Sequence, residues 1–449
     1  MMRLFLRVFC ATAIGILLLL GWHQIVLLEV RKKYEENFKT VDDVYIRKFP
    51  FPFKAAVAIC SDIDMTGTME EFVKIQRFLN TKEMTIIGQG VGLQIGNSFL
   101  MYEDPKHTIS YFNSGSDVAA EIGRYIKSGA IDVMHSFGKK KEFSRDHAIQ
   151  AIAELENNNL KVDVWVDHAT ASNNMGDDVT FGTGDHPDSD TYHADLTIRY
   201  GIKYAWLGRV TMIIGQEVVP DLEQFYQVFD SAHYVKSISN MVKELAKHYL
   251  SFLGSKKYSM HAKNRLVEIK QLDDGQKIYE FIRFDNHWDG VSTGANSKNL
   301  GYILSEKSIQ RLKSRGGYMI VYTHLGMNDG CKEVICEEAA NSLRLLEKEF
   351  RDGDIFVTTT SKLLNYYIVS KYLNWVIDKK DNDLIRITIL SVEDPVFGSF
   401  IPSMQQLEGI TFCIPKNKSV EMYLGQEEIH SVKINSLDQK NQASISIIK

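Results

Sequence analysis

One stretch decides which fold the sequence predicts: Ala55-Ala-Val-Ala-Ile-Cys-Ser-Asp-Ile-Asp64. Residues 55–60 are apolar without interruption, which is typical of a strand buried on both faces of a sheet. Two carboxylates, Asp62 and Asp64, follow at once. A buried strand that ends in acidic residues is typical of parallel β/α proteins, because their strand C-termini gather at one face and build the active site.

Five further runs along the chain have the same apolar, strand-like character. They lie at residues 131–134, 162–166, 204–207, 318–322 and 355–358. Helical stretches fall between them, for example at residues 118–128 and 145–157. This alternation predicts βα units and therefore an α/β fold with a parallel sheet or barrel.

The C-terminal part has a different pattern, because the helical signal disappears after Trp375. Residues 383–449 contain short strand-like runs instead, at residues 384–390, 410–414 and 444–448. Short strands without helices between them predict a small β-sandwich module. We therefore expect a β/α body at residues 51–375 and a β-rich accessory module at residues 383–449.

The N-terminal segment predicts a membrane anchor. Residues 8–28 contain no Asp, Glu, Lys or Arg, and about 20 apolar residues suffice for a helix to cross a bilayer. We expect a transmembrane helix within residues 1–30, a charged stalk at residues 31–50 and a single-pass protein whose body is extracytoplasmic (periplasmic, extracellular or lumenal). The alternatives are a signal peptide, whose cleavage would give a secreted protein, and a buried soluble helix.

Charge and motif content argue against several other classes of protein. The net charge is −5 and the body has no Lys/Arg-rich block. The sequence therefore lacks the basic cluster that nucleic-acid-binding proteins use to contact phosphates. No Gly-x-Ser-x-Gly elbow, phosphate loop or dinucleotide fingerprint occurs, which removes the commonest competing enzyme classes. Cys331 and Cys336 are close enough in sequence for a disulfide, although spacing alone cannot show one.

Four of the predicted strands end in residues that can bind a metal or carry protons. These are Asp62 and Asp64 after the first strand, and His135, His168 and His324 after three others. Carboxylate plus imidazole is a normal ligand set for Zn²⁺ or a similar divalent metal. Each residue alone also has a plain structural interpretation, as a helix cap or as a buried or surface polar group. Their coincidence on four strand ends favours one functional site.

A long polar loop at residues 169–195 follows His168. It is rich in Gly, Asn and His, as functional loops often are, although a solvated surface excursion has the same composition. The predicted substrate-binding residues are Asn173, Asn174, Asp185, His193 and, after a later strand-like run, Arg283. His193 is also a candidate for a second histidine ligand of the metal.

Three of these segments together resemble the motifs of the polysaccharide deacetylase (NodB-homology) superfamily. They are Ser61-Asp62-Ile63-Asp64, the run from Gly129 to Ser136, and Tyr322-Thr323-His324-Leu325. The resemblance covers roughly residues 52–365 in order. It implies a distorted (β/α) barrel of deacetylase type. By this resemblance Asp62 is the catalytic base, Asp64 and His135 bind the metal, and His324 is the general acid.

The chain departs from the family pattern at two places. Its first motif is Asp-x-Asp, where the family has adjacent aspartates. The family also has a second histidine ligand four residues after the first, and this chain has Lys139 there. His168, or alternatively His193, would have to supply the missing ligand.

The resemblance implies a membrane-anchored, metal-dependent hydrolase that removes N-acetyl or O-acetyl groups from a polysaccharide or glycan, with Zn²⁺ as the expected metal. One alternative keeps the barrel but changes the reaction to glycoside hydrolysis, with Asp62, Asp64 or Asp167 as the carboxylates. The other is a non-catalytic glycan-binding or assembly protein whose metal site has decayed, and Lys139 is the main indication for it.

Overall fold

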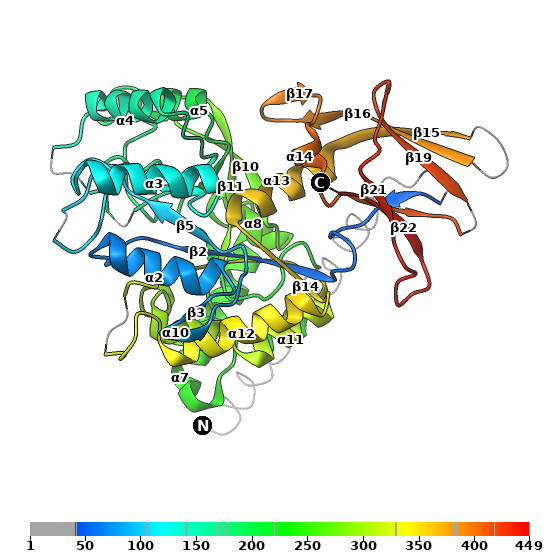
Figure 1. Ribbon diagram of the computed structural model, residues 1–449. Coiled ribbons are helices and arrows are strands. Elements are labelled where there is room, and N and C mark those ends of the chain that lie inside the picture. The colour runs from blue at the N-terminus through cyan, green and yellow to red at the C-terminus, as the bar shows by residue number, and fades with distance from the viewer. Residues whose placement is uncertain are drawn as a thin grey trace.

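The computed structural model describes residue 41 and residues 43–104, 106–139, 142–168, 170–176, 178–219, 221–327, 330–379, 384–416 and 418–448. These residues form a mixed α/β body around one large curled sheet, with a smaller β-rich part beside it (Figure 1). The predicted α/β class and the parallel strands are confirmed.

The central strand of the large sheet is β2 (Ala55–Ser61), whose seven residues are all buried. It pairs in parallel with β13 (Tyr318–Thr323) on one side, and with β14 (Ile355–Thr358) and β5 (Gly96–Phe99) on the other. Both faces of β2 are covered by other elements, which is why its sequence is apolar throughout rather than alternating.

The sheet curls into a half-barrel through further parallel strands. From β5 it continues with β6 (Val133–His135), β7 (Val164–Val166) and β8 (Tyr204–Trp206), and from β13 with β12 (Arg283–Phe284) and β9 (Val210–Thr211). β11 (Lys277–Phe281) pairs in parallel with β8 and in antiparallel with β10 (Val267–Gln271). Only Ile282 separates β11 from β12. The continuous segment 277–284 therefore pairs with β8 at one side of the curl and with β13 and β9 at the other.

Helices cover the outside of the curl and close one of its ends. Ala55, Val57 and Ile59 of β2 share one core with the helices at Met69–Asn80 (α2), Ser297–Ile303 (α10), Glu306–Arg315 (α11) and Glu337–Arg351 (α12). The alternate residues of β2 pack with the helix Thr360–Tyr372 (α13). The α13 residues Ser361 and Asn365 also hydrogen-bond the carboxylates that precede β6 and β7. α13 therefore covers the N-terminal ends of these strands, and the C-terminal ends are left to carry a site.

The remaining elements of the body connect these strands. The helices are α2 (Met69–Asn80), α3 (Ser116–Ser128), α4 (Arg145–Asn157), α5 (Ala194–Tyr200), α6 (Leu222–Tyr226), α7 (Tyr234–Phe252), α8 (Ser259–Ala262), α9 (Val291–Gly294), α10 (Ser297–Ile303), α11 (Glu306–Arg315), α12 (Glu337–Arg351) and α13 (Thr360–Tyr372). A two-stranded hairpin of β3 (Met84–Thr85) and β4 (Gly88–Gln89) follows α2.

A disulfide joins Cys331 to Cys336 in the segment before α12, which answers the question that their spacing left open.

The C-terminal part contains two sheets that share one core. The first has β15 (Leu373–Lys379), β16 (Leu384–Asp394), β17 (Gly398–Phe400), β19 (Ser419–Leu424) and β20 (Glu427–Glu428). The second has β1 (Tyr45–Ile46), β18 (Thr411–Ile414), β21 (Val432–Ile434) and β22 (Ala443–Ile447). Trp375 of the first sheet stacks edge-on against Phe412 of the second, at 5.2 Å between ring centroids. The short helix α14 (Met404–Leu407) also contributes Leu407 to this core.

The structure bears on two expectations for the N-terminal part of the chain. The end of the predicted 31–50 stalk is a strand, because β1 pairs with β18 of the C-terminal sheet. We also correct the prediction of a single-pass membrane protein: no helix among the described residues has the length and apolarity that a bilayer crossing needs. Residues 8–28, on which that prediction rested, lie outside the described residues.

Candidate metal centre

Five ionisable side chains meet at the C-terminal ends of the parallel strands. They are Asp62 and Asp64 after β2, His135 at the end of β6, His168 after β7, and His324 directly after β13. The backbone N–H of Asp62 donates to the carbonyl of Thr323 at 2.7 Å, which keeps the ends of β2 and β13 level. Residues that are up to 262 positions apart in the chain thus share one rim, as the strand-end pattern predicts.

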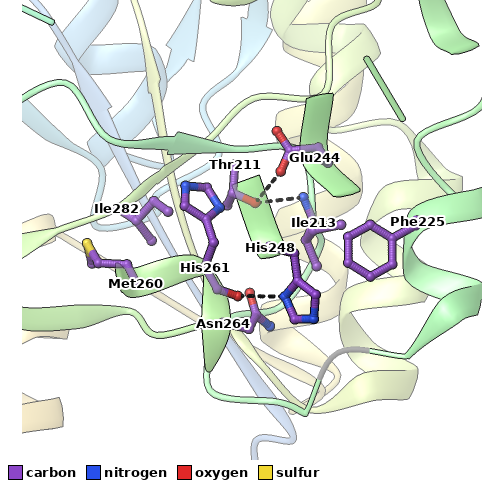
Figure 2. A pocket seen from close by; sticks show the side chains of 9 residues that line it. All are labelled: Thr211, Ile213, Phe225, Glu244, His248, Met260, His261, Asn264 and Ile282. Carbon is purple, nitrogen blue, oxygen red and sulfur yellow. Dashed lines mark hydrogen bonds between the residues drawn. The ribbon is translucent and has the colours of Figure 1, made fainter. Parts of the chain in front are cut away.

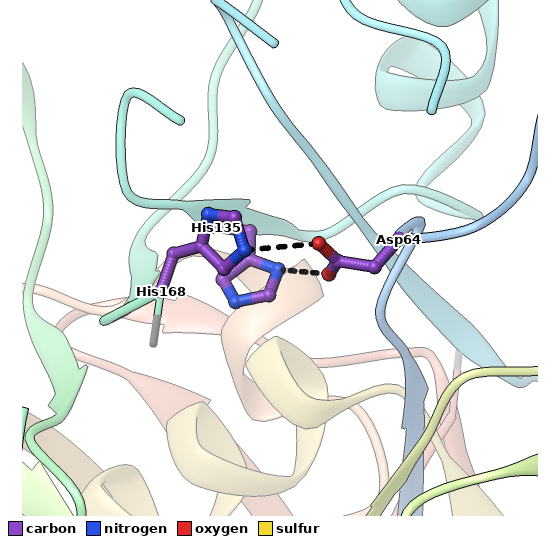
Figure 3. A group of neighbouring side chains, drawn as sticks. All are labelled: Asp64, His135 and His168. Carbon is purple, nitrogen blue, oxygen red and sulfur yellow. Dashed lines mark ion pairs between the residues drawn. The ribbon is translucent and has the colours of Figure 1, made fainter. Parts of the chain in front are cut away.

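Asp64, His135 and His168 form a group that could hold a metal ion. Asp64 Oδ2 lies 3.1 Å from His135 Nδ1, and Asp64 Oδ1 lies 3.0 Å from His168 Nε2 (Figure 3). Two ligand atoms that share a tetrahedral zinc ion at about 2.0–2.2 Å are separated by about 3.4 Å. Asp64 Oδ2 is also buried without a hydrogen bond among the described residues. Spacing and donor chemistry therefore fit a divalent cation.

The backbone is strained next to two of these residues. Met65, which follows Asp64, has φ +62°, and Ser136, which follows His135, has φ +49°. Residues other than Gly, Asn and Asp seldom adopt this left-handed backbone region, because it costs them roughly 1–3 kcal/mol. Strain that is retained beside converging donor atoms is typical of functional sites.

Asp62 lies beside the metal group but is held by different partners. It is 1% exposed, and the Sγ–H of Cys60 donates to its Oδ1 at 3.7 Å. Its Oδ1 is also 3.8 Å from His135 Nδ1, and its Oδ2 accepts from Arg283 Nη1 at 3.4 Å. Asp62 is thus a second carboxylate that is separate from the one facing both imidazoles.

The charges in this cluster stabilise one another. Burial raises the pKa of Asp62, but His135, Arg283 and His324 outweigh it and hold that pKa below its ordinary value. Burial also raises the pKa of Asp64, and His135 and His168 hold it well below its ordinary value. Burial lowers the pKa of His135, but the two carboxylates outweigh it and raise that pKa. A bound cation would replace imidazole protons in this cluster.

Arg283, which the sequence predicts to bind substrate, is a buried partner of Asp62. Its guanidinium carbon lies 4.4 Å from the ring centroid of Trp206 and 4.2 Å from that of Tyr322, and the side chain is 1% exposed. Stacking between two aromatic rings fixes the plane of the guanidinium. Arg283 therefore orients Asp62 and supplies it with a permanent positive neighbour.

His324 has one ring nitrogen fixed and the other facing the site. Its Nδ1 lies 2.5 Å from the carbonyl oxygen of Ala295, which can only accept, so Nδ1 carries the proton. Its Nε2 lies 3.6 Å from Asp64 Oδ2. This orientation leaves Nε2 as the atom that can exchange a proton inside the site.

Two of the predicted substrate-binding residues are instead internal supports of their loop. Asn173 is fully buried, accepts from the backbone N–H of Phe137 and donates to the carbonyl of Gly138. His193 is also fully buried, with Nε2 2.7 Å from the carbonyl of Asn173 and Nδ1 2.8 Å from Thr197 Oγ1. His193 does not belong to the group of Asp64, His135 and His168 that could hold a metal ion.

Asn174 and Asp185 are buried for similar reasons. Asn174 Oδ1 accepts from the backbone N–H of His168 at 2.8 Å, and its Nδ2 donates to the carbonyl of Thr180 at 3.1 Å. Asp185 is 3% exposed and accepts from the backbone N–H of Asp273 at 3.1 Å. Much of the polar composition of the loop thus serves hydrogen bonds within the protein, and substrate binding by these residues stays a prediction.

Lys139 and His168 differ in their distance from the metal group. Lys139 has an exposed side chain, and its backbone N–H donates to Glu103 Oε2 at 3.0 Å. Of the two alternatives, His168 is the one whose ring nitrogen lies close to Asp64 and His135, in the group that could hold a metal ion. Glu103 was not anticipated from the sequence, because it follows β5, whose residues Gly-Asn-Ser-Phe lack a strand-like apolar run.

A separate small cavity lies under the insertion that contains α7 (Figure 2). It is lined by Thr211, Ile213, Phe225, Glu244, His248, Met260, His261, Asn264 and Ile282. Its polar groups bond within the protein: Thr211 Oγ1 donates to Glu244 at 3.3 Å, and His248 Nδ1 lies 3.0 Å from the carbonyl of His261. None of these residues belongs to the metal group.

Comparison with known proteins assigns the chain to no family. No family model matches the chain, and no curated protein matches it. A solved structure, 4-alpha-glucanotransferase from Thermococcus litoralis, is similar at 12% sequence identity and a TM-score of 0.33. The matched region covers 69% of this chain and 40% of that one, so this chain spans well under half of that protein.

Proposed function

We propose that the chain is a metal-dependent hydrolase that removes N-acetyl or O-acetyl groups from a polysaccharide or glycan. The observation that carries the proposal is the separation of two carboxylates in one cluster. Asp64 faces two imidazole nitrogens at 3.0 and 3.1 Å, whereas Asp62 is held apart by Arg283 and Cys60. One carboxylate can therefore bind a metal while the other accepts a proton.

Zn²⁺ is the metal that we propose for the group of Asp64, His135 and His168. Two imidazoles and one carboxylate that leave a position open are a common catalytic zinc set. When bound, such an ion would polarise the acyl carbonyl and lower the pKa of water beside it.

The chain's own residues divide the proton transfers. Asp62, kept ionised by Arg283, accepts a proton from the water whose oxygen attacks the acyl carbon. His324 donates a proton from Nε2 to the leaving nitrogen or oxygen as the bond to the acyl carbon breaks. The products are acetate and a free amine or hydroxyl on the sugar.

The structure also bears on the two alternatives. Asp167, one carboxylate available to a glycoside hydrolase, already accepts from Trp165 Nε1, Thr180 Oγ1 and the backbone N–H groups of Met175 and Gly176. It is 1% exposed and has no free oxygen for a sugar. Lys139 stands where the family has its second histidine ligand, and this departure favoured a decayed site. His168 is close enough to Asp64 and His135 to replace that ligand. Both observations support the deacetylase proposal over its rivals.

The test is the product released by the purified full chain after addition of Zn²⁺, Co²⁺ or Mn²⁺. N-acetylated and O-acetylated oligosaccharides should release acetate without new reducing ends, and Asp62→Asn should abolish the release. Asp188→Asn, which changes an exposed carboxylate elsewhere in the body, is the matched control and should keep full activity. New reducing ends would support the glycosidase instead, and no product with any of the three metals would contradict the proposal.

A further inference from the structure

One ring nitrogen of the ligand candidate His168 has no hydrogen bond to any residue that the structure describes. Its Nε2 faces Asp64, but its Nδ1 is buried and has no hydrogen bond among the described residues. The carboxylate oxygen Oε2 of Glu103 lies 3.9 Å from this Nδ1. A movement of about 1 Å would bring the two atoms to hydrogen-bond distance.

Glu103 is held in this position by several bonds. Its Oε2 accepts the backbone N–H of Lys139 at 3.0 Å, and its Oε1 accepts that of Asp104 at 3.2 Å. Its own carbonyl accepts from Asn113 Nδ2 at 2.7 Å. The carboxylate thus comes from the segment after β5, is fastened to the segment after β6, and faces a ligand candidate that follows β7.

The other two histidines of the cluster already have their rings oriented. The ring of His324 is oriented by the bond from Nδ1 to the carbonyl of Ala295, and its Nε2 lies 3.6 Å from Asp64 Oδ2. His135 uses Nδ1 towards Asp64, with Ser98 Oγ 3.5 Å from the same atom. His168 alone offers Nε2 to the metal group and has a buried Nδ1 that faces a carboxylate.

We propose that Glu103 is the positioning residue of His168: it accepts the Nδ1 proton and thereby fixes the tautomer that presents Nε2 to the metal. A histidine ligand generally donates its second N–H to a carboxylate, carbonyl or water, and losing that partner typically costs 10–100-fold in metal affinity. The inference rests on the proposed function, because it presupposes a metal. It also gives position 139 a role, since the backbone there fastens the carboxylate that supports the replacement ligand.

The test measures Zn²⁺ affinity by competition with a chromophoric chelator, using the full chain. Glu103→Gln keeps the size of the side chain and removes its charge, and should weaken zinc binding at least about tenfold. The matched control is Asp104→Asn, at the neighbouring exposed carboxylate that bonds only the backbone of Lys106 among the described residues. It should leave the affinity within twofold, and the thermal midpoints of both metal-free variants should match that of the natural chain.

A second readout reports on the tautomer directly. Long-range ¹H–¹⁵N spectra of the zinc-loaded, histidine-labelled protein should contain one Nδ1–H signal that is lost in His168→Ala. That signal should shift in Glu103→Gln and stay in place in Asp104→Asn. Glu103→Asp keeps the charge but withdraws it by one methylene, so its zinc affinity should fall between those of the natural chain and Glu103→Gln.

The outcomes separate the inference from the proposed function. If the natural chain binds zinc and Glu103→Gln binds it equally well, Glu103 does not position His168, and the metal site stands. If Glu103→Gln fails to fold, an unchanged affinity in Glu103→Asp would overturn the inference in the same way. If the natural chain binds neither Zn²⁺, Co²⁺ nor Mn²⁺, both ideas are overturned.

Discussion

His135 and His193 are both buried histidines in the β/α body, and they differ in what faces their rings. His135, at the end of β6, has two carboxylates within 4 Å of Nδ1, and these raise its pKa. His193, in the polar loop after β7, has the carbonyl of Asn173 and the hydroxyl of Thr197. Burial lowers the pKa of His193 to about 4, so this ring is neutral.

The two histidines therefore lie in different environments. The strand-end cluster could bind a metal ion and exchange protons, whereas the ring of His193 is already hydrogen-bonded within the protein. A neutral ring with both nitrogens hydrogen-bonded has satisfied its polar groups and needs no ligand. A ring beside two carboxylates keeps charge in a buried place, which is costly unless the charges are paired, and such clusters are candidates for functional sites. Residue type and loop composition do not distinguish these two cases.

The largest expected effect comes from removing a ligand at the cluster. His135→Ala should reduce zinc affinity more than about 100-fold, because it removes a proposed ligand, which should cost more than losing an outer partner. His193→Ala should keep far more of the affinity in its folded fraction. Isothermal titration calorimetry of both variants checks this contrast, and equal losses would remove the distinction between the two histidines.

The next effect concerns the reaction rather than the metal. Asp62→Asn should lower kcat by about 10²–10⁴-fold, the range for loss of a general base, while zinc affinity changes little. Acetate release and chelator competition on the same preparation measure the two quantities. A variant that loses zinc and activity together would make Asp62 part of the metal group instead.

The two histidines should also respond oppositely to acid in the metal-free protein. His193 has a lowered folded pKa, so its stabilising effect is present above about 6.5 and is lost as pH falls, by about 2 kcal/mol between pH 7.5 and 5. His135 has a raised folded pKa, so its contribution is present below the unfolded value and is lost as pH rises. Urea unfolding at both pH values should show less acid sensitivity in His193→Gln and more in His135→Gln. The same slope in both variants would refute the assignment.

The smallest expected effect on zinc affinity comes from a residue of the polar loop that contacts the strand-end cluster. Asn174 belongs to the loop, but its Oδ1 accepts the backbone N–H of His168 and so holds the segment that carries this proposed ligand. Asn174→Ala should weaken zinc binding about tenfold, as for an outer partner of a ligand. Asn158→Ala, at an exposed asparagine that bonds only Glu154 among the described residues, serves as the control. No difference between the two variants would show that the loop is independent of the cluster.

Local sequence pattern was sufficient for several central strands and for the residues at their ends, although not for β5 or for Glu103 after it. Uninterrupted apolar runs mark strands such as β2 and β13, and parallel pairing then brings Asp64, His135 and His324 to one rim. This reasoning needs only the order of strands and the direction in which they run.

What the sequence could not supply depends on long-range hydrogen bonds. The polar loop residues Asn173, Asn174, Asp185 and His193 have the composition of a binding loop, but the folded chain uses them to bond its own backbone. Likewise nothing in the charged 31–50 stretch shows that β1 pairs with β18, more than 360 positions away. Such pairings are decided by the packed structure rather than by local propensity.

The central claim is that the strand-end cluster binds a divalent metal, and metal content tests it most directly. The purified full chain, incubated with zinc and dialysed, should retain about one Zn²⁺ per chain by mass spectrometry of its elements. His135→Ala should retain none, and His193→Gln should retain as much as the natural chain. Zinc absent from the natural chain, or retained equally by His135→Ala, would contradict the account.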